Sequence, residues 1–433
     1  GCGSRMVSAI AKMYHTTKMI LRTAIVTASI GVRQGSPTSC LLFTLVVNDL
    51  IRRMKEKCPP DSWLEWLHIL MLMDDTIILA TTRVKAEQKI KILTEFCHSS
   101  GMAINQDKTK FMVINGKPID KEAITTTDDN NYEITIENCE NYTYLGCIFT
   151  QDGNMIRSVK NQCNSKIPHV AKFEAFISKH RDAPYQVKKK VFEAALSTAI
   201  LYSCESWLSA AAAECARNMY IQCIRCMLSV RKTTAGDLCL IESDLPSATS
   251  RVKSLQKAAI RRLLDERDGM EDDPFWFVYT KSQIENAPCA RYIQTLETFN
   301  PEVDRMELTR MIRNSSRTKF QTYCTINPTL THHDMYDCQD VHEHHRIVTT
   351  RIRLSSHNLA IERGRWLRKP REERLCERCD AIQDEQHALR DCLLNSDARR
   401  CSPCTDFNIP SFFTANTPAV MTSTCYAIIK DYV

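Results

Sequence analysis

The stretch LHILMLMDDTIILATT (Leu67–Thr82) places two adjacent aspartates, Asp74 and Asp75, in the middle of an apolar run. Each apolar arm is strand-sized and rich in Ile, Leu and Thr, so the pattern predicts a β-hairpin with both carboxylates at its tip. An Asp-Asp pair also suits an ordinary polar turn. Like charges repel, however, and a divalent cation held by both carboxylates would relieve that repulsion.

The composition is that of a globular protein with two or three domains. The 433 residues carry a net charge of +6, which is compatible with a polyanionic partner. No apolar run approaches the ~18–20 residues that span a bilayer, so no membrane segment is expected. The 21 cysteines are scattered singly, which indicates a reducing, intracellular compartment and some metal binding.

The chain changes character near residue 155, from mixed helices and strands to helices alone. Before that point the pattern predicts a helix and then strands over 1–30, helices over 40–57 and 84–101, and a hairpin over 142–154 with Asp152–Gly153 at its turn. After it, Pro184–Leu208 reads as one long helix with a broad apolar face.

A compact group of metal-ligand residues lies in CERCDAIQDEQHALRDC (Cys376–Cys392). Its spacing is Cys376-x2-Cys379-x7-His387-x4-Cys392, and three thiolates with one imidazole favour tetrahedral Zn²⁺. The alternative is coincidence in a cysteine-rich chain. A second pair, Cys401 and Cys404, could compete for the ion or stay free.

A basic stretch precedes this group and favours nucleic-acid contact over a solvated linker. Between Arg346 and Arg374 its cations are Arg346, Arg351, Arg353, Arg363, Arg365, Arg368, Lys369, Arg371 and Arg374. Trp366 lies among them and could stack on a base. Lys188–Lys190 and Arg261–Arg262 could contact phosphates or form a solvated face. Thr331–His345 (THHDMYDCQDVHEHH) matches no metal-site spacing and is expected to be polar surface.

Five segments, in order and spacing, resemble the reverse transcriptases of non-LTR (LINE-type) retrotransposons over roughly residues 30–400. They are GVRQGSPTSCLLFTLVVNDL (Gly31–Leu50), LMDD (Leu72–Asp75), GMAINQDKTKFMV (Gly101–Val113), YTYLGCIFTQDG (Tyr142–Gly153) and LYSCESW (Leu201–Trp207). Two positions depart from the family pattern. Leu72 replaces the usual aromatic of the catalytic box, and Cys40 replaces the usual proline.

The resemblance implies an α+β fold, in which a partial polymerase palm, an antiparallel sheet with packed helices, is followed by an all-α region and a small zinc knuckle. The implied domains are a partial palm at 1–154, a helical thumb-like region at 155–290, a linker with the basic stretch at 291–370, the zinc knuckle at 371–405 and a tail at 406–433.

The resemblance also implies roles for particular residues. Asp74 and Asp75 would be the catalytic ligands of a two-magnesium site for RNA-directed DNA synthesis. Residues beside the nucleotide and template would be Arg33, Gln34, Gly35 and Lys108, although Arg33 and Lys108 could equally be solvated cations. Nucleic-acid contacts would come from Arg363, Arg365, Trp366, Arg368 and Lys369. The implied partners are an RNA template, a DNA primer or target and dNTPs, and the implied location is nuclear.

One expected carboxylate is missing. Polymerases of this family take a further metal-binding aspartate from a strand well upstream of the Gln-Gly segment, yet residues 1–48 contain no Asp or Glu. The first acidic residue, Asp49, follows that segment on a predicted helix. We therefore expect an incomplete, weakly active or inactive fragment. The alternative is a non-catalytic nucleic-acid-binding protein derived from such an element.

Overall fold

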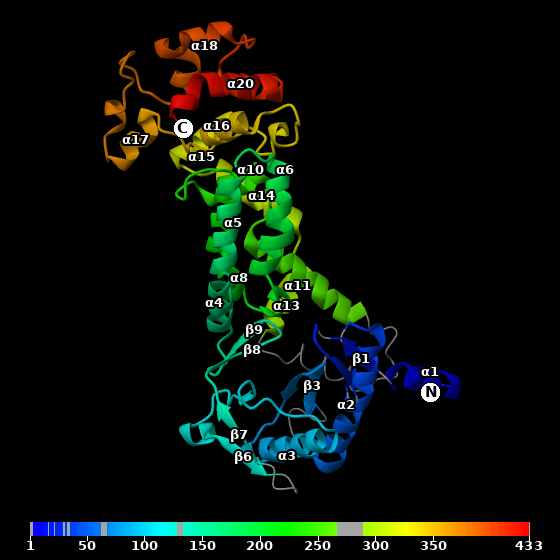
Figure 1. The fold of residues 1–433 in the computed structure, drawn as a ribbon. Helices are drawn as coiled ribbons and strands as arrows, with labels where there is room; N and C mark the ends of the chain where they lie inside the picture. Colours follow the sequence, from blue (N-terminus) through cyan, green and yellow to red (C-terminus); the bar gives the residue numbers. More distant parts are fainter. Residues whose placement is uncertain are drawn as a thin grey trace. The chain divides into compact units, whose positions relative to one another are not determined.

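The computed structural model describes residues 3–15, 17–20, 22–28, 31–32, 35–61, 67–127, 133–265 and 289–432. The chain divides into two compact units, Gly1–Gly153 and Asn154–Val433, and each is described by itself (Figure 1). Within the described ranges, no helix has both the length and the apolar character that crossing a bilayer requires.

The N-terminal unit mixes helices and short strands, as the sequence predicts. Its elements are α1 (Ser4–Tyr14), β1 (Thr17–Ile20), β2 (Ile25–Ala28), α2 (Pro37–Lys57), β3 (Ile69–Leu72), β4 (Asp75–Ile78), α3 (Arg83–Ser99), β5 (Lys110–Phe111), η1 (Pro118–Lys121), β6 (Ile124–Thr127), β7 (Glu133–Asn138), β8 (Asn141–Tyr144) and β9 (Cys147–Thr150).

The two long helices of this unit, α2 and α3, pack against each other. Helix α2 packs against α3 through Leu50, Met54 and Phe96, all of which are buried. The N-terminus of α3 is capped by Thr82, whose side chain accepts a hydrogen bond from the Lys85 amide. Gly101 follows the helix with φ +66°, the left-handed conformation that commonly ends helices. The predicted helix boundaries are confirmed here within a few residues.

The strands do not form the single antiparallel sheet that the sequence suggested. Among the described residues they pair as β1–β2, β3–β4 and β8–β9 hairpins and as one three-stranded sheet in the order β5-β7-β6, in which β5 pairs parallel to β7. The predicted turn of the β8–β9 hairpin was also wrong. Tyr144 pairs with Cys147, so Leu145 and Gly146 form the turn. Both have positive φ, as a type I′ turn requires.

The C-terminal unit is built from helices. Its elements are α4 (Met155–Ser165), α5 (Ile167–Lys179), α6 (Tyr185–Val191), η2 (Phe192–Ser197), α7 (Thr198–Ile200), η3 (Cys204–Ser206), α8 (Ala210–Glu214), α9 (Arg217–Met227), α10 (Gly236–Ser243), α11 (Ala248–Asp265), α13 (Ala290–Glu297), α14 (Pro301–Arg313), α15 (Thr318–Ile326), η5 (Asp334–Tyr336), α16 (Glu343–Arg353), α17 (Ala360–Trp366), η6 (Arg371–Glu373), η7 (His387–Asp391), η8 (Leu393–Asn395), α18 (Ser396–Cys401), α19 (Ile409–Ala415), α20 (Pro418–Ile429) and η9 (Lys430–Tyr432).

The long helix predicted over Pro184–Leu208 is interrupted. A π-helical segment, η2, replaces its middle, and the regular helix ends at Ile200. Ser203 then adopts the left-handed conformation, with φ +61°. The buried Gln256 side chain holds the corner that follows, because its amide donates to the carbonyls of Cys204 and Trp207. An apolar face alone could not show this break, since the buried positions continue through it.

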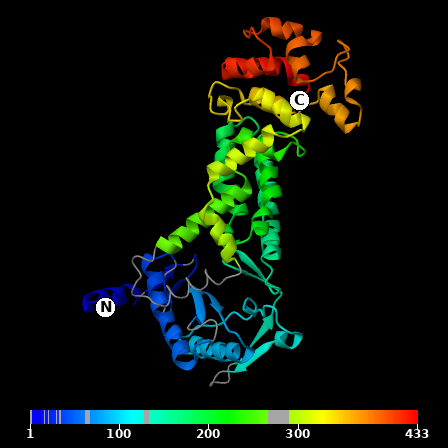
Figure 2. The ribbon, with the colours of Figure 1, turned by 180° about the vertical axis from the view of Figure 1, so that it is seen from behind.

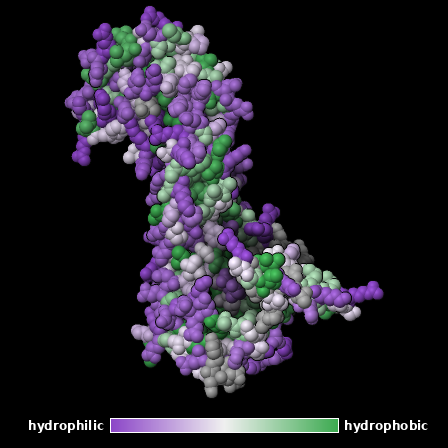
Figure 3. Space-filling model, viewed as in Figure 1, coloured by the Kyte–Doolittle hydropathy of each residue, from purple (hydrophilic) through white to green (hydrophobic). Residues whose placement is uncertain are grey.

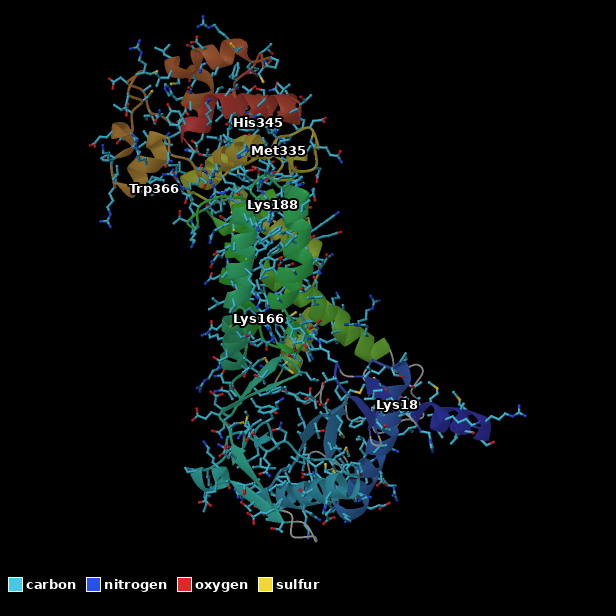
Figure 4. The ribbon with its side chains drawn as sticks, in the orientation of Figure 1. Lys18, Lys166, Lys188, Met335, His345 and Trp366 are labelled. Carbon is cyan, nitrogen blue, oxygen red and sulfur yellow. The ribbon has the colours of Figure 1, made fainter. Side chains whose placement is uncertain are left out.

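A single large core joins the helices of the C-terminal unit, from α4 to α20. Figures 1 and 2 show α16 and α20 packed side by side. The prediction that Thr331–His345 is polar surface was wrong in part, because Met335 and Tyr336 are buried in this core. Figure 4 shows Met335 among the packed elements. The polar composition of this segment did not indicate exposure, because the Tyr336 hydroxyl forms hydrogen bonds with buried side chains.

Candidate functional site

The paired aspartates lie at the tip of the β3–β4 hairpin, as predicted. Leu72 pairs with Asp75, so the two-residue loop is Met73–Asp74. Met73 has φ +56°, an uncommon conformation for a residue with a side chain. Such strain costs free energy and often occurs at functional turns. Both aspartates are exposed at this tip.

The described part of the chain supplies no counter-charge to the two carboxylates. Among the residues that the structure describes, none forms an ion pair with Asp74 or Asp75. Nor do the described His, Cys, Asp and Glu side chains place a third potential ligand beside them. The tip therefore offers two hard oxygen ligands and leaves the remaining positions of a cation to substrate or water.

Two tyrosines of β8 connect this tip with another predicted site segment. The Tyr144 hydroxyl donates to the Asp75 carbonyl at 3.4 Å, and the Tyr142 hydroxyl donates to the Lys108 carbonyl at 3.1 Å. Partial burial, and then the nearby Asp75 charge, raise the pKa of Tyr144. The sequence reasoning assigned no role to these side chains, although the Tyr-Thr-Tyr alternation places both on one face of the strand.

Of the other predicted nucleotide-site residues, the structure describes Gly35 and Lys108. Arg33 and Gln34 lie outside the described residues. Gly35 is exposed with φ +82°, and no heavy atom approaches within 4 Å of the position a Cβ would take. Lys108 is exposed at the surface. Neither Gly35 nor Lys108 makes a hydrogen bond or ion pair with the aspartates in the described part of the chain, so their predicted roles remain predictions.

The Cys/His group converges in space. The ligand atoms of Cys376, Cys379, His387 and Cys392 all lie within 4.8 Å of one another. The sulfurs of Cys376 and Cys392 are 3.7 Å apart. A disulfide would need ~2.05 Å, whereas two sulfurs on a tetrahedral zinc with ~2.3 Å bonds lie ~3.8 Å apart. The donor set and its spacing therefore fit a metal ion.

A π-turn explains the x4 spacing between the last two ligands. In an α-helix, residues five apart point ~140° away from each other, because each residue turns the chain by ~100°. Here η7 has a wider turn, in which the Cys392 amide donates to the His387 carbonyl at 2.8 Å. This i→i+5 hydrogen bond brings both side chains to one side.

The first two ligands lie on a tight knuckle. A β-bridge between Leu375 and Ile382 closes the loop that holds Cys376 and Cys379. Burial raises the pKa of the Cys376 thiol, but the Arg378 and Cys379 amides, which point at the sulfur, outweigh burial and lower this pKa to about 7. The knuckle thus favours a thiolate, the form that binds metals.

Buried polar groups support the element that carries His387. Glu385 accepts hydrogen bonds from Ser355 at 2.7 Å and from His357 Nε2 at 3.0 Å. The Nε2 of His387 is itself buried and, among the described residues, has no hydrogen-bond partner. An imidazole nitrogen that binds a metal ion would likewise be buried without a hydrogen-bond partner from the protein. Cys401 and Cys404 do not belong to the converged group.

The structure corrects part of the basic stretch. Arg346 and Arg353 are buried and cannot contact a nucleic acid in this fold. Arg353 pairs with the buried Glu242, and Arg346 pairs with Glu343. The sequence pattern failed because a run of charges does not show which cations the core buries. Glu242 reaches Arg353 from α10, whereas Glu343 lies one turn before Arg346 on α16.

One predicted thumb cation is also part of the core. Lys188 is fully buried and pairs with Glu343 at 2.6 Å, so it is no phosphate contact. Figure 4 shows it on α6, among the packed helices of the C-terminal unit. By contrast Lys190, Arg261 and Arg262 are exposed.

The later part of the basic stretch differs, because most of it is at the surface. Arg363, Trp366, Arg368 and Lys369 are exposed on α17 and on the turn that follows it. Arg365 is only 25% exposed and pairs with the buried Glu362. Figure 4 shows Trp366 at the outer edge of the helical unit.

Comparisons with known proteins match the N-terminal unit. Residues 3–149 match the family described as reverse transcriptase (RNA-dependent DNA polymerase). The chain is 24% identical over 128 residues to the Pol polyprotein of a type-1 R2 retrotransposable element of Popillia japonica, covering 28% of this chain and 21% of that protein. It is also similar to R2 Pol polyproteins of Drosophila melanogaster (24% over 148 residues, covering 33% and 14%) and Nasonia vitripennis (29% over 136 residues, covering 28% and 12%). The match thus spans about a fifth or less of these relatives.

Proposed function

From the match of residues 3–149 to the reverse transcriptase family, we propose that this chain is an RNA-directed DNA polymerase polypeptide of a non-LTR retrotransposon. The observation that carries the proposal is the β3–β4 hairpin, which presents Asp74 and Asp75 exposed, with no ion-pair partner among the residues that the structure describes. It lies within the matched segment, and the order of motifs around it follows the family. The N-terminal unit is accordingly a partial palm, and the helices of residues 155–290, among them α4 to α11, are thumb-like.

Asp74 and Asp75 would hold Mg²⁺ together with substrate phosphates, a donor set that this ion prefers. When bound, such ions lower the pKa of the primer 3′-hydroxyl and stabilise the leaving pyrophosphate. The chain's own contribution is to position the two carboxylates. Tyr144 donates to the Asp75 carbonyl and so restrains the hairpin. Arg33, Gln34, Gly35 and Lys108 would face the nucleotide and template.

Among the residues that the structure describes, the expected catalytic carboxylate set is incomplete. Residues 1–48 contain no acidic side chain, and no third ligand joins the aspartates among the described residues. This observation favours a second candidate function, a nucleic-acid-binding protein without catalysis. Both candidates share the partners, an RNA template with a DNA primer or target, and a nuclear location.

A template–primer assay tests the proposal. We expect the purified chain to bind an RNA template annealed to a DNA primer at low salt, and to extend that primer with Mg²⁺ and dNTPs weakly or not at all. Robust extension that Asp74→Ala abolishes would establish the polymerase and refute the incomplete site. Absence of any template–primer binding at low salt would refute both candidates.

We also propose that the converged group of Cys376, Cys379, His387 and Cys392 is a structural zinc site. Its four protein ligands leave no open position, as in sites that stabilise a fold and do no chemistry. We expect one zinc ion per chain after native purification and loss of that ion in His387→Ala. The matched control is Cys401→Ser, which removes an exposed thiol and should retain the metal.

A further inference from the structure

The C-terminal turn of α17 has features that its sequence does not reveal. The Lys369 amide donates to the Gly364 carbonyl at 2.9 Å, and the Arg368 amide donates to the Arg365 carbonyl at 3.2 Å. These two bonds form a Schellman motif, in which the residue after the helix is left-handed and is usually glycine. Here that residue is Arg368, with φ +54°. An exposed cation thus occupies a position where glycine would be more stable.

A second arginine, Arg374, holds this turn through hydrogen bonds to backbone carbonyls. The Arg374 guanidinium donates to the Lys369 carbonyl at 2.7 and 3.0 Å and to the Ile361 carbonyl at 3.2 Å. Its side chain crosses Gly364 so closely that a Cβ there would lie 2.5 Å from the Arg374 Cγ. The turn is therefore rigid, and Arg368 and Lys369 extend from it into solvent.

Trp366 is also held in place, by a residue from a distant part of the chain. The Arg231 guanidinium lies 4.0 Å from the centre of the indole ring. Its position is fixed by hydrogen bonds from Nη1 to the His357 carbonyl at 2.8 Å and from Nη2 to the Asn358 side chain at 2.6 Å. Arg231 covers one face of the indole, and the side chain remains 48% exposed.

We propose that this turn binds single-stranded nucleic acid, with Trp366 stacking on an unpaired base, Arg368 and Lys369 contacting the backbone, and Arg231 as the positioning residue of the indole. An aromatic ring with one open face accepts a base that is free of its neighbours, whereas duplex bases are already stacked. Charge complementarity supports this partner, since Arg363 also lies exposed on the same helix, where its guanidinium forms only a long surface contact of 3.9 Å with the exposed Glu377. Glu372 and Glu373 follow on η6, beyond the turn. The proposal rests on the nucleic-acid binding proposed above.

The test compares binding and stability in the same variants. Fluorescence anisotropy is measured with one labelled oligonucleotide sequence as single-stranded RNA, single-stranded DNA and duplex, over a salt series. We expect Arg368→Gly to raise the melting temperature yet weaken single-strand binding, lowering the salt slope by ~0.7 for one lost contact. The matched control is Ser203→Gly, which relieves the same left-handed strain elsewhere and should leave binding unchanged.

Stacking is tested at the indole. We expect Trp366→Ala to weaken single-strand binding by about tenfold or more and duplex binding much less. Trp366→Phe should retain most of the single-strand affinity. Arg231→Gln should resemble Trp366→Ala. A loss that is equal for single strands and duplex, or an Arg368→Gly variant that is more stable with unchanged binding, would overturn this inference. Wild-type protein that binds none of the three probes would instead refute the proposed function.

Discussion

Acidic side chains meet opposite environments in the two units. Asp74 and Asp75 stand exposed at a hairpin tip in the N-terminal unit, with no cation beside them among the described residues. In the C-terminal unit Glu242 is wholly buried and accepts hydrogen bonds from Arg353, Tyr323 and Tyr336 at 2.6 to 3.2 Å. The carboxylates of Asp74 and Asp75 are accessible to a ligand, whereas side chains of the protein already donate hydrogen bonds to both oxygens of Glu242. Burial and protein partners thus distinguish a carboxylate that stabilises the fold from one that is accessible at the surface.

Surface hydropathy shows a related difference. Helix α1 has no buried residue, and apolar side chains of α1 and α2 are exposed, including Met6, Leu41 and Leu45. Figure 3 shows hydrophobic surface over this part of the N-terminal unit. In the C-terminal unit the long apolar side chains mostly enter one large core. The N-terminal unit is thus less completely packed by its own residues.

Metal removal should produce the largest effect on stability. Structural zinc contributes about 10–16 kcal/mol of apparent binding free energy in small zinc-dependent folds. We expect chelation to expose the amides of the knuckle and of η7 to hydrogen exchange while leaving the β3–β4 hairpin unchanged. Equal exchange with and without chelator would contradict a structural metal site.

Glu242→Gln should be the most destabilising single change at a buried carboxylate. It leaves the buried Arg353 without a full counter-charge, which typically costs about 3–5 kcal/mol. Urea denaturation of the C-terminal unit within the full chain measures this. The matched control is Glu307→Gln, whose carboxylate is half exposed and pairs with Arg310, so the change should cost under about 1 kcal/mol. Similar losses of unfolding free energy in both variants would contradict the distinction between buried and exposed carboxylates.

The same carboxylate predicts a pH dependence. Burial would raise the pKa of Glu242, but the Arg353 charge and hydrogen bonds outweigh it and lower the pKa. A lowered folded-state pKa contributes stability that is present above the unfolded value of ~4.3 and is lost as pH falls below it. We expect wild type to lose stability below about pH 4 more steeply than Glu242→Gln, as followed by denaturation at a series of pH values.

Ser203→Gly should stabilise the chain modestly. Ser203 has φ +61°, and a left-handed residue with a side chain costs roughly 1–2 kcal/mol relative to glycine. Because glycine also gains freedom in the unfolded chain, we expect a net gain of about 1 kcal/mol or less. A clear loss in thermal denaturation would show that the Ser203 hydroxyl, which lies 3.3 Å from Ser206, matters more than backbone strain.

Asp74→Asn should change stability least, although it removes the proposed catalytic ligand. The side chain is exposed, and the substitution relieves repulsion from Asp75, so we expect a change within about 0.5 kcal/mol. Urea denaturation again measures it. A large loss would mean that the carboxylate stabilises the hairpin itself, and the comparison between accessible and buried carboxylates would fail.

The sequence by itself determined the local elements of the functional site. Alternating apolar arms defined the aspartate hairpin, and Cys-x2-Cys with a following His and Cys defined the knuckle, because both depend on short spacings. Composition also determined the change from mixed to helical structure near residue 155.

Tertiary structure decided which polar groups are available. Arg346, Arg353 and Lys188 look like surface cations in the sequence, yet all three are buried beside acidic partners. The partners of Arg353 and Lys188 come from other helices. Tyr144 reaches the β3–β4 hairpin, and Arg231 reaches Trp366, across separations of 69 and 135 positions in the chain. Spacing and propensity act over a few residues, whereas burial and charge pairing depend on which distant segments the core brings together.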